Sequence, residues 1–247
     1  MTQFYDLLAP GLGVLTAFVL AVLVILVAVG SARKFWLLLL YVSWELFATI
    51  GLTVADLRLH GTVQAVTRDG RLYSILYWSN EIIVDSLRFI LVSVLIYKVA
   101  GSPRFVRWLL TGLVLAMLVL PFVLFQPVFP LPGSLEASFD SFPSRPWFNS
   151  TSQLLNFGVA IMNVALWGAL LGSKMRDRQI LEVSVGLGLL AAGSALGLGL
   201  RHFHDKGDLT AVFNLFLNLT QLAAWVIWCD AFWPAARQRI RGPASPS

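Results

Sequence analysis

Long apolar runs separated by short polar stretches dominate this chain. Seven runs are each close to the ~20 residues that a helix needs to cross a bilayer. Because a segment in lipid must satisfy its own backbone hydrogen bonds, these runs predict helices. No run shows the alternating pattern that is typical of membrane β-strands. The predicted spans are 10–30, 35–57, 73–99, 105–128, 147–172, 180–200 and 211–233.

This pattern predicts an all-α membrane protein, a bundle of seven transmembrane helices. We expect a single domain over residues 1–233, followed by a short basic tail over residues 234–247. The first connection, residues 31–34, leaves little more than a turn. The first two helices should therefore be antiparallel neighbours.

The composition supports a membrane location. Hydrophobic residues make up 57% of the chain and charged residues only 13%, with a mean hydropathy of +0.77. A soluble domain carries about 25% charged residues. The net charge of +5 does not indicate nucleic acid as a partner, because the basic residues lie in short clusters between apolar runs. The single cysteine, Cys229, excludes an internal disulfide.

The distribution of these basic clusters predicts the orientation. Cytoplasmic connections of membrane proteins are enriched in lysine and arginine. We therefore expect the N-terminus outside and the C-terminus in the cytoplasm, in a multi-pass protein of a bacterial inner (plasma) membrane. The clusters lie in the first, third and fifth connections and the tail, and contain Arg33, Lys34, Lys98, Arg104, Arg107, Lys174, Arg176, Arg178, Arg237, Arg239 and Arg241.

The third span carries charges where lipid would exclude them. In "YWSNEIIVDSLRF", Glu81, Asp85 and Arg88 share one helical face, which Tyr77 extends. A charge near the bilayer centre costs at least ~2.5–3.5 kcal/mol. These side chains should therefore face the interior of the bundle, where Asp85 and Arg88 can pair.

Further polar residues in other spans are expected around these charges. Glu45 in the second span adds a third acid to Glu81 and Asp85, against the single Arg88. One carboxyl group is therefore left free to hold a proton, a cation or a polar ligand. The alternative is a purely structural role, in which the buried pair sets helix packing. The candidate site is Glu45, Tyr77, Glu81, Asp85, Arg88, Asn156, Asn163, Asn218 and Gln221.

Small residues distinguish the sixth span. Gly193 and Gly197 form a pattern that allows another helix to approach closely, so this span is expected to serve packing.

No sequence motif predicts an enzyme, a metal or a cofactor. There is no nucleophile elbow, zinc-protease motif or phosphate-binding loop. The seventh span contains no lysine for a retinal Schiff base. The three histidines, His60, His202 and His204, fall at helix ends or in connections and predict no metal site.

The segments "YWSNE" and "YKVAGSP", together with the seven-span layout, resemble a group of uncharacterised bacterial seven-helix membrane proteins. The resemblance implies the fold and brings no activity with it.

Three functions remain open from the sequence. The first is a receptor- or sensor-like protein that binds a small ligand or a proton within the bundle. The second is a proton- or cation-coupled carrier of small solutes. The third is a non-catalytic subunit or scaffold of a larger complex. The expected partners are the lipid bilayer, a small ligand or proton and, for the first and third functions, another membrane protein.

Overall fold

The structure, a computed structural model, is all helical over the residues that it describes: 2–60, 66–99, 104–124, 145–172, 177–203 and 208–241. Each helix coincides with one predicted apolar run, which confirms the seven predicted helices. The helices are α1 (Thr2–Ser31), α2 (Trp36–His60), α3 (Val66–Val99), α4 (Arg104–Leu124), α6 (Arg145–Gly172), α7 (Arg178–Phe203) and α8 (Asp208–Arg241).

Two described connections show how helix ends are set. Between α1 and α2, the amides of Lys34 and Phe35 both donate to the Ser31 carbonyl at 3.0 Å, which closes the expected tight turn. Before α7, the Asp177 carboxylate accepts a hydrogen bond from the Gln179 amide at 3.1 Å. Asp177 is therefore the N-cap of α7, because it satisfies an amide that lacks a partner within the helix.

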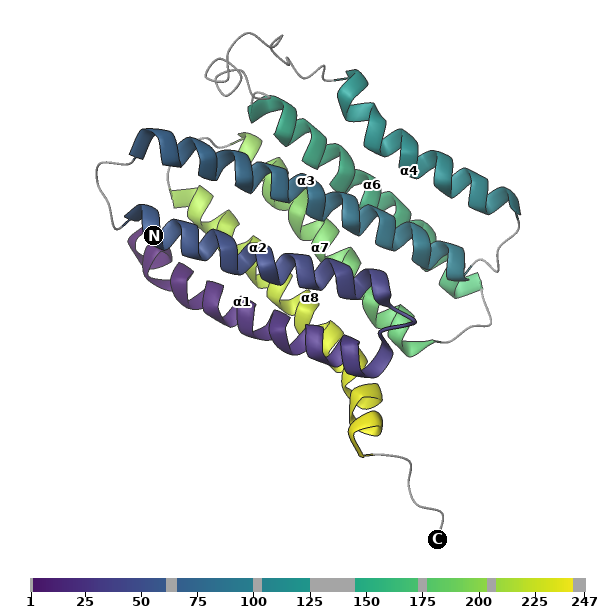
Figure 1. Cartoon of the computed structure of the whole chain (residues 1–247). Coiled ribbons are helices and arrows are strands. Elements are labelled where there is room, and N and C mark those ends of the chain that lie inside the picture. Colours follow the sequence, from purple (N-terminus) through teal and green to yellow (C-terminus); the bar gives the residue numbers. More distant parts are fainter. Residues whose placement is uncertain are drawn as a thin grey trace.

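Six of the helices form a closed ring, and the seventh lies outside it. Around the ring, α1 packs on α2, α2 on α3, α3 on α6, α6 on α7, α7 on α8, and α8 on α1. Among the described residues, the remaining helix, α4, contacts only α3 and α6, and it lies at the edge of the bundle (Figure 1). The interior of the ring is therefore bounded by every described helix except α4.

Contacts along the helices give their directions. Gly30 of α1 lies beside Ala236 of α8, and Cys229 of α8 lies beside Val19 of α1, so these two helices run parallel. In contrast, Trp228 and Thr220 of α8 face α7 in reverse order, so α7 and α8 are antiparallel. The end of α1 and the end of α8 thus lie at the same end of the bundle, called here the α1–α2 turn end.

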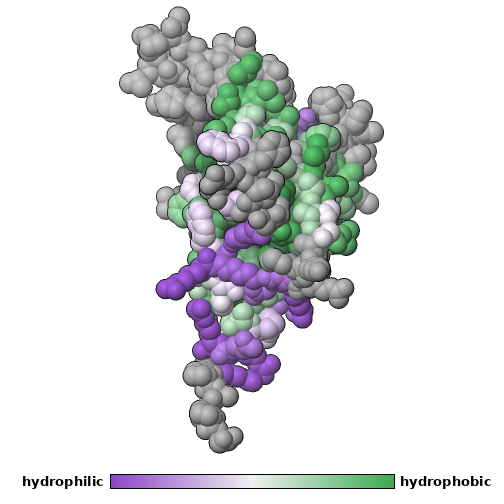
Figure 2. All heavy atoms as spheres, turned by 90° about the vertical axis from the view of Figure 1, so that its right-hand side faces the viewer, coloured by the Kyte–Doolittle hydropathy of each residue, from purple (hydrophilic) through white to green (hydrophobic). Residues whose placement is uncertain are grey.

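Hydrophilic side chains gather at the α1–α2 turn end. Figure 2 looks onto this end and shows them spread across it, with hydrophobic side chains above. The exposed basic residues of the described chain here are Arg33, Lys34, Arg178, Arg237, Arg239 and Arg241. Their position agrees with the expected clustering of positive charge.

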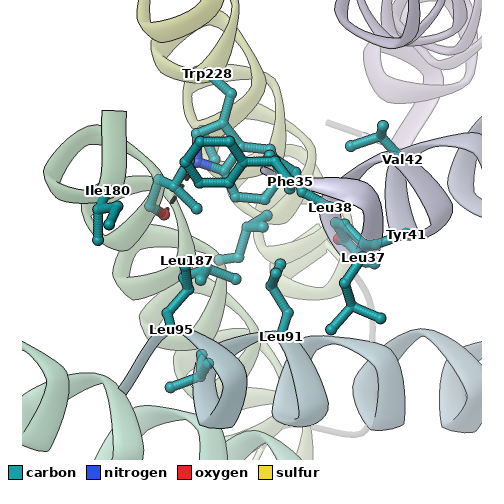
Figure 3. Close-up of a cluster of buried hydrophobic side chains, with 14 of the residues drawn as sticks. Phe35, Leu37, Leu38, Tyr41, Val42, Leu91, Leu95, Ile180, Leu187 and Trp228 are labelled. Carbon is teal, nitrogen blue, oxygen red and sulfur yellow. Dashed lines mark hydrogen bonds between the residues drawn. The ribbon is translucent and has the colours of Figure 1, made fainter. Parts of the chain in front are cut away.

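A layer of large apolar side chains fills the ring next to this end. Leu38 of α2, Leu91 and Leu95 of α3, and Leu187 of α7 are at most 2% exposed and point toward one another (Figure 3). Trp228 of α8 completes this hydrophobic layer, and its indole N–H donates to the Val183 carbonyl at 3.1 Å. The layer closes the interior of the ring at this level.

Glycine on α7 allows α8 to approach closely. A methyl group on Gly186 would lie 2.1 Å from Trp228 Nε1, and one on Gly193 would lie 2.4 Å from Thr220 Oγ1. Both distances are too short for non-bonded atoms, so these positions require the absence of a side chain. Gly186 and Gly193 thus have the packing role that was expected for the sixth predicted span, which is α7. The surroundings of Gly197 lie outside what the structure describes.

Four helices of the described chain are long and apolar enough to cross a membrane: Gly11–Ser31, Trp36–Val54, Ser150–Gly172 and Leu215–Arg241. Their outward faces are also apolar, with Phe18 66%, Phe47 72% and Val164 73% exposed. A helix that is apolar on all sides belongs in lipid or in a large core. These helices therefore indicate a membrane protein.

Candidate functional site: a polar cavity in the helix bundle

Arg88 of α3 is the centre of a buried polar network. Its Nη2 donates to Glu45 of α2 at 3.1 Å, and its Nη1 donates to Asp85, one turn earlier on α3, also at 3.1 Å. Its Nε donates to the Tyr41 hydroxyl at 2.9 Å, and this hydroxyl donates in turn to Glu45 at 3.0 Å. One guanidinium therefore joins α2 and α3 through three partners.

Asp85 connects the same network to α6. Its Oδ2 accepts hydrogen bonds from Ser152 Oγ at 2.5 Å and from Asn156 Nδ2 at 2.8 Å, while its Oδ1 binds Arg88. Asp85 is fully buried, so both carboxylate oxygens need partners inside the protein, and both have them. Three neighbouring helices of the ring are thus held in register at one level.

The network is buried but does not balance its charge. Asp85, Arg88 and Glu45 are 0%, 2% and 8% exposed. Two carboxylates share one guanidinium, so the ionised group carries a net negative charge. Glu81, one turn before Asp85 on the same face of α3, adds a third carboxylate that is only half-buried. The Tyr77 hydroxyl donates a hydrogen bond to it.

Next to this network lies a cavity of about 520 Å³. It extends from Arg88 toward the end of the bundle at which α1 and α8 begin, on the other side of the network from the hydrophobic layer. All six helices of the ring contribute to its wall. The polar residues that line it are Thr16, Glu45, Thr49, Thr53, Tyr77, Asn80, Glu81, Arg88, Asn156, Ser194, Asn218 and Gln221.

Two buried polar atoms at this cavity lack a hydrogen-bond partner among the described residues. They are Oδ1 of Asn156, an acceptor, and Nε1 of Trp225, a donor. The two side chains are 2% and 1% exposed, and both residues line the cavity. An unpartnered buried donor or acceptor costs about 1–3 kcal/mol. Each of these atoms has almost no accessible surface, so a molecule in the cavity would reach it only if the neighbouring side chains moved.

The structure brings together eight of the nine candidate residues that were chosen from the sequence. Seven of them line the cavity and the eighth, Asp85, is hydrogen-bonded to two of those seven. Asn163 lies apart. It is two helical turns beyond Asn156 on α6, and its amide is hydrogen-bonded to the Ser184 hydroxyl of α7 at 3.1 Å. Its role is therefore to join α6 to α7.

Sequence reasoning missed several members of the site. Tyr41 lies one turn before Glu45, and Ser152 one turn before Asn156, so helical spacing alone could have identified both. Trp225 lies one turn after Gln221 on α8 and continues the polar stripe of that span, so the same spacing could have included it. Trp44 of α2 was also missed, and its indole N–H donates to Asn80 of α3 at 2.9 Å.

Within the part of the chain that the structure describes, no three His, Cys, Asp or Glu side chains converge as a metal site would require. The side chains of His60, His202 and His204 lie outside the described residues. Glu45, Glu81 and Asp85 line or border one cavity but do not form such a group.

Charged side chains connect helices at the α1–α2 turn end. Lys34 pairs with Asp177, and Lys98 donates to the Lys34 carbonyl, so this turn is attached to α3 and α7. Arg178 binds Glu182 at 2.5 Å and Asp230 of α8 at 2.9 Å. The hydrogen bond to Glu182 raises the pKa of Arg178 above its ordinary value. These exposed pairs lie beyond the hydrophobic layer, on the side away from the cavity.

No protein-family model matches the chain, and neither the curated proteins nor the solved structures contain a match to it.

Proposed function

We propose that all seven helices cross the membrane and that α3 crosses with its charges turned into the ring. The burial of Asp85 and Arg88 supports this, because neither side chain would face lipid. The parallel directions of α1 and α8 also agree with an odd number of crossings. In this proposal the N-terminus lies outside, and the cationic α1–α2 turn end lies in the cytoplasm.

We further propose a receptor-like function, in which the cavity binds a small polar ligand that enters from outside. The cavity itself is the observation that carries this proposal. Its volume of about 520 Å³ lies within the range of ~300–1,000 Å³ that is typical of small-molecule sites. A purely structural ion pair would need no such space beside it.

Filling the cavity without changing its charges tests this proposal. Ala48 of α2 lines the cavity and is half-buried, so Ala48→Trp should occupy part of the space. A small-molecule library should contain compounds that raise the melting temperature of the purified protein in detergent. A ligand whose concentration is 100 times its Kd stabilises the folded protein by about 2.7 kcal/mol. Ala48→Trp should abolish that stabilisation.

Ala223→Trp is the matched control. Ala223 is exposed on the lipid-facing side of α8, so the same substitution there should leave ligand stabilisation unchanged. The proposal fails if no compound stabilises the protein. It also fails if stabilisation persists in Ala48→Trp.

A coupled carrier is the second candidate, and one observation favours it. The cavity ends at the Arg88 network, the hydrophobic layer seals the ring beyond it, and the ion pairs of Lys34 and Arg178 join the helices at the far end. A carrier in its outward-facing state has this arrangement, and it must also open the sealed end. Uptake of the bound compound into vesicles that contain the protein separates a carrier from a receptor.

A further inference from the structure

We propose that the ligand of this cavity is a small organic cation, whose ammonium group binds at Glu81. This inference rests on the proposed binding function of the cavity and adds the chemical class of the ligand to it. Four features of the site carry it: the charge balance, the state of Arg88, the uncharged polar residues of the wall, and the size and aromatic residues of the cavity.

The charge balance favours a cation. Glu45 and Asp85 both bind Arg88, whereas Glu81 pairs with no basic side chain among the described residues. The Tyr77 hydroxyl donates to the Glu81 carboxylate but brings no positive charge. A carboxylate that is partly removed from water is stabilised strongly by a nearby cation, because the surroundings screen the attraction weakly. Glu81 lines the cavity, so a cation there can reach it.

The state of Arg88 disfavours an anion. Its guanidinium already donates to Tyr41, Glu45 and Asp85, and two carboxylates offset its charge. An anionic ligand would therefore meet a negative surface rather than a free guanidinium. This separates a cationic ligand from a carboxylate or phosphate compound of the same size.

The uncharged polar residues of the cavity wall indicate that the ligand also has a polar body. Thr16, Thr49 and Gln221 line the same cavity. A ligand that carries a hydroxyl group beside its ammonium could form a hydrogen bond with one of these side chains. They are uncharged and thus independent of the excess of carboxylates.

The size and composition of the cavity favour an organic cation over a metal ion. About 520 Å³ is far more space than a bare ion needs, and the described acids do not converge as metal ligands. Tyr77 and Trp225, both in the cavity wall, are residues whose ring faces attract organic ammonium groups. A ligand of a few carbon atoms with one positive charge fits all of these features.

A panel of ammonium compounds tests the inference on the purified full-length protein. The probes are tetramethylammonium, ethanolamine and choline, each as the chloride. The neutral analogue 3,3-dimethylbutan-1-ol has the shape of choline without its charge, and sodium chloride controls for ionic strength. We expect at least one ammonium compound to raise the melting temperature and to bind in calorimetry, with the neutral analogue binding at least about tenfold more weakly, or about 1.4 kcal/mol.

Two variants locate the binding site, and a third serves as the control. Glu81→Gln keeps the shape of the side chain and should weaken binding of the cation at least about tenfold, a loss of about 1.4 kcal/mol. Trp225→Phe replaces an indole of the cavity wall with a ring that attracts cations less strongly, and should weaken binding of choline, which keeps the inference testable if Glu81→Gln does not fold. Asp230→Asn removes an exposed carboxylate at the α1–α2 turn end and should bind as the unmodified protein does.

The outcomes separate this inference from the proposed function. Equal binding of choline and its neutral analogue, unchanged affinity in both Glu81→Gln and Trp225→Phe, or no binding of any ammonium compound overturns the inference. If neutral or anionic library compounds still stabilise the protein and Ala48→Trp abolishes their effect, the cavity is a ligand site for another chemical class. If no compound of any class binds, both proposals fall.

Discussion

At the scale of single residues, Arg88 decides the character of this bundle. It is 2% exposed and pairs with two carboxylates from two helices, while its Nε donates a hydrogen bond to the Tyr41 hydroxyl. Exposed ion pairs contribute little to stability, because water solvates the separated charges well. A buried pair differs, because removal of one partner leaves the other charged group without compensation.

We therefore predict that Arg88→Met strongly destabilises the protein. Glu45 and Asp85 would both lose their counter-charge, and breaking a buried pair in this way costs about 3–5 kcal/mol. The midpoint of denaturant-induced unfolding in detergent measures the change.

Arg178→Met is the control for this prediction. Arg178 also bridges two carboxylates, Glu182 and Asp230, but its side chain is 68% exposed. The substitution should shift the midpoint much less than Arg88→Met. Similar midpoints for the two variants would contradict the importance of the buried network.

At the scale of elements, the contact between α7 and α8 depends on small residues. Gly186 and Gly193 lie two turns apart on α7, and each leaves space for a side chain of α8. The close approach places the indole of Trp228 against the backbone of α7, where it donates to the Val183 carbonyl. Trp228 is also part of the hydrophobic layer, so this contact helps to close the ring below the cavity.

Gly186→Ala should destabilise this contact. The added methyl group would lie 2.1 Å from Trp228 Nε1, so either the helices separate or the indole loses its hydrogen bond. Overpacking of this kind costs about 1–3 kcal/mol. Thermal unfolding followed by tryptophan fluorescence measures the loss.

Gly168→Ala on α6 serves as the comparison. Apart from the neighbouring backbone of α6 itself, no atom of the described residues lies within 4 Å of the position that its methyl group would occupy. Alanine favours a helix over glycine by up to about 1 kcal/mol, so this variant should be neutral or more stable. Equal melting temperatures for the two variants would show that α7 and α8 tolerate a wider separation.

At the scale of the whole molecule, the ring has two different ends. One end carries the cationic connections and the hydrophobic layer, and the cavity extends toward the other. The parallel arrangement of α1 and α8 places the two termini of the described chain at opposite ends (Figure 1). If the bundle spans the membrane, its termini therefore lie on opposite sides.

Reporter fusions test this orientation in cells. Green fluorescent protein after Ser247 should fluoresce, because its fluorophore matures in the cytoplasm. Alkaline phosphatase at the same position should be inactive, because this enzyme matures only on the outer side of the membrane. A protease-sensitive tag before Met1 should be cleaved from outside. Termini on the same side would contradict seven crossings and favour an even number, such as the four helices that are apolar enough by composition.

The sequence determined the elements because the pattern of apolar residues is local. Each predicted run became a helix, and the spacing of Glu81, Asp85 and Arg88 correctly indicated a shared inward face with an Asp85–Arg88 pair. Burial of this face followed from the cost of charges in lipid. The resemblance to uncharacterised seven-helix proteins stays a prediction.

Only the tertiary structure decided how these elements combine, because helical periodicity does not specify which helices are neighbours. It placed α4 outside the ring, attached Asn156 to Asp85, and moved Asn163 away to Ser184 of α7. It also revealed the cavity and the unpartnered Trp225 N–H, since empty space and missing partners arise from packing between helices. The sequence by itself thus determined which residues must avoid lipid, and the packing of the ring decided what those residues surround.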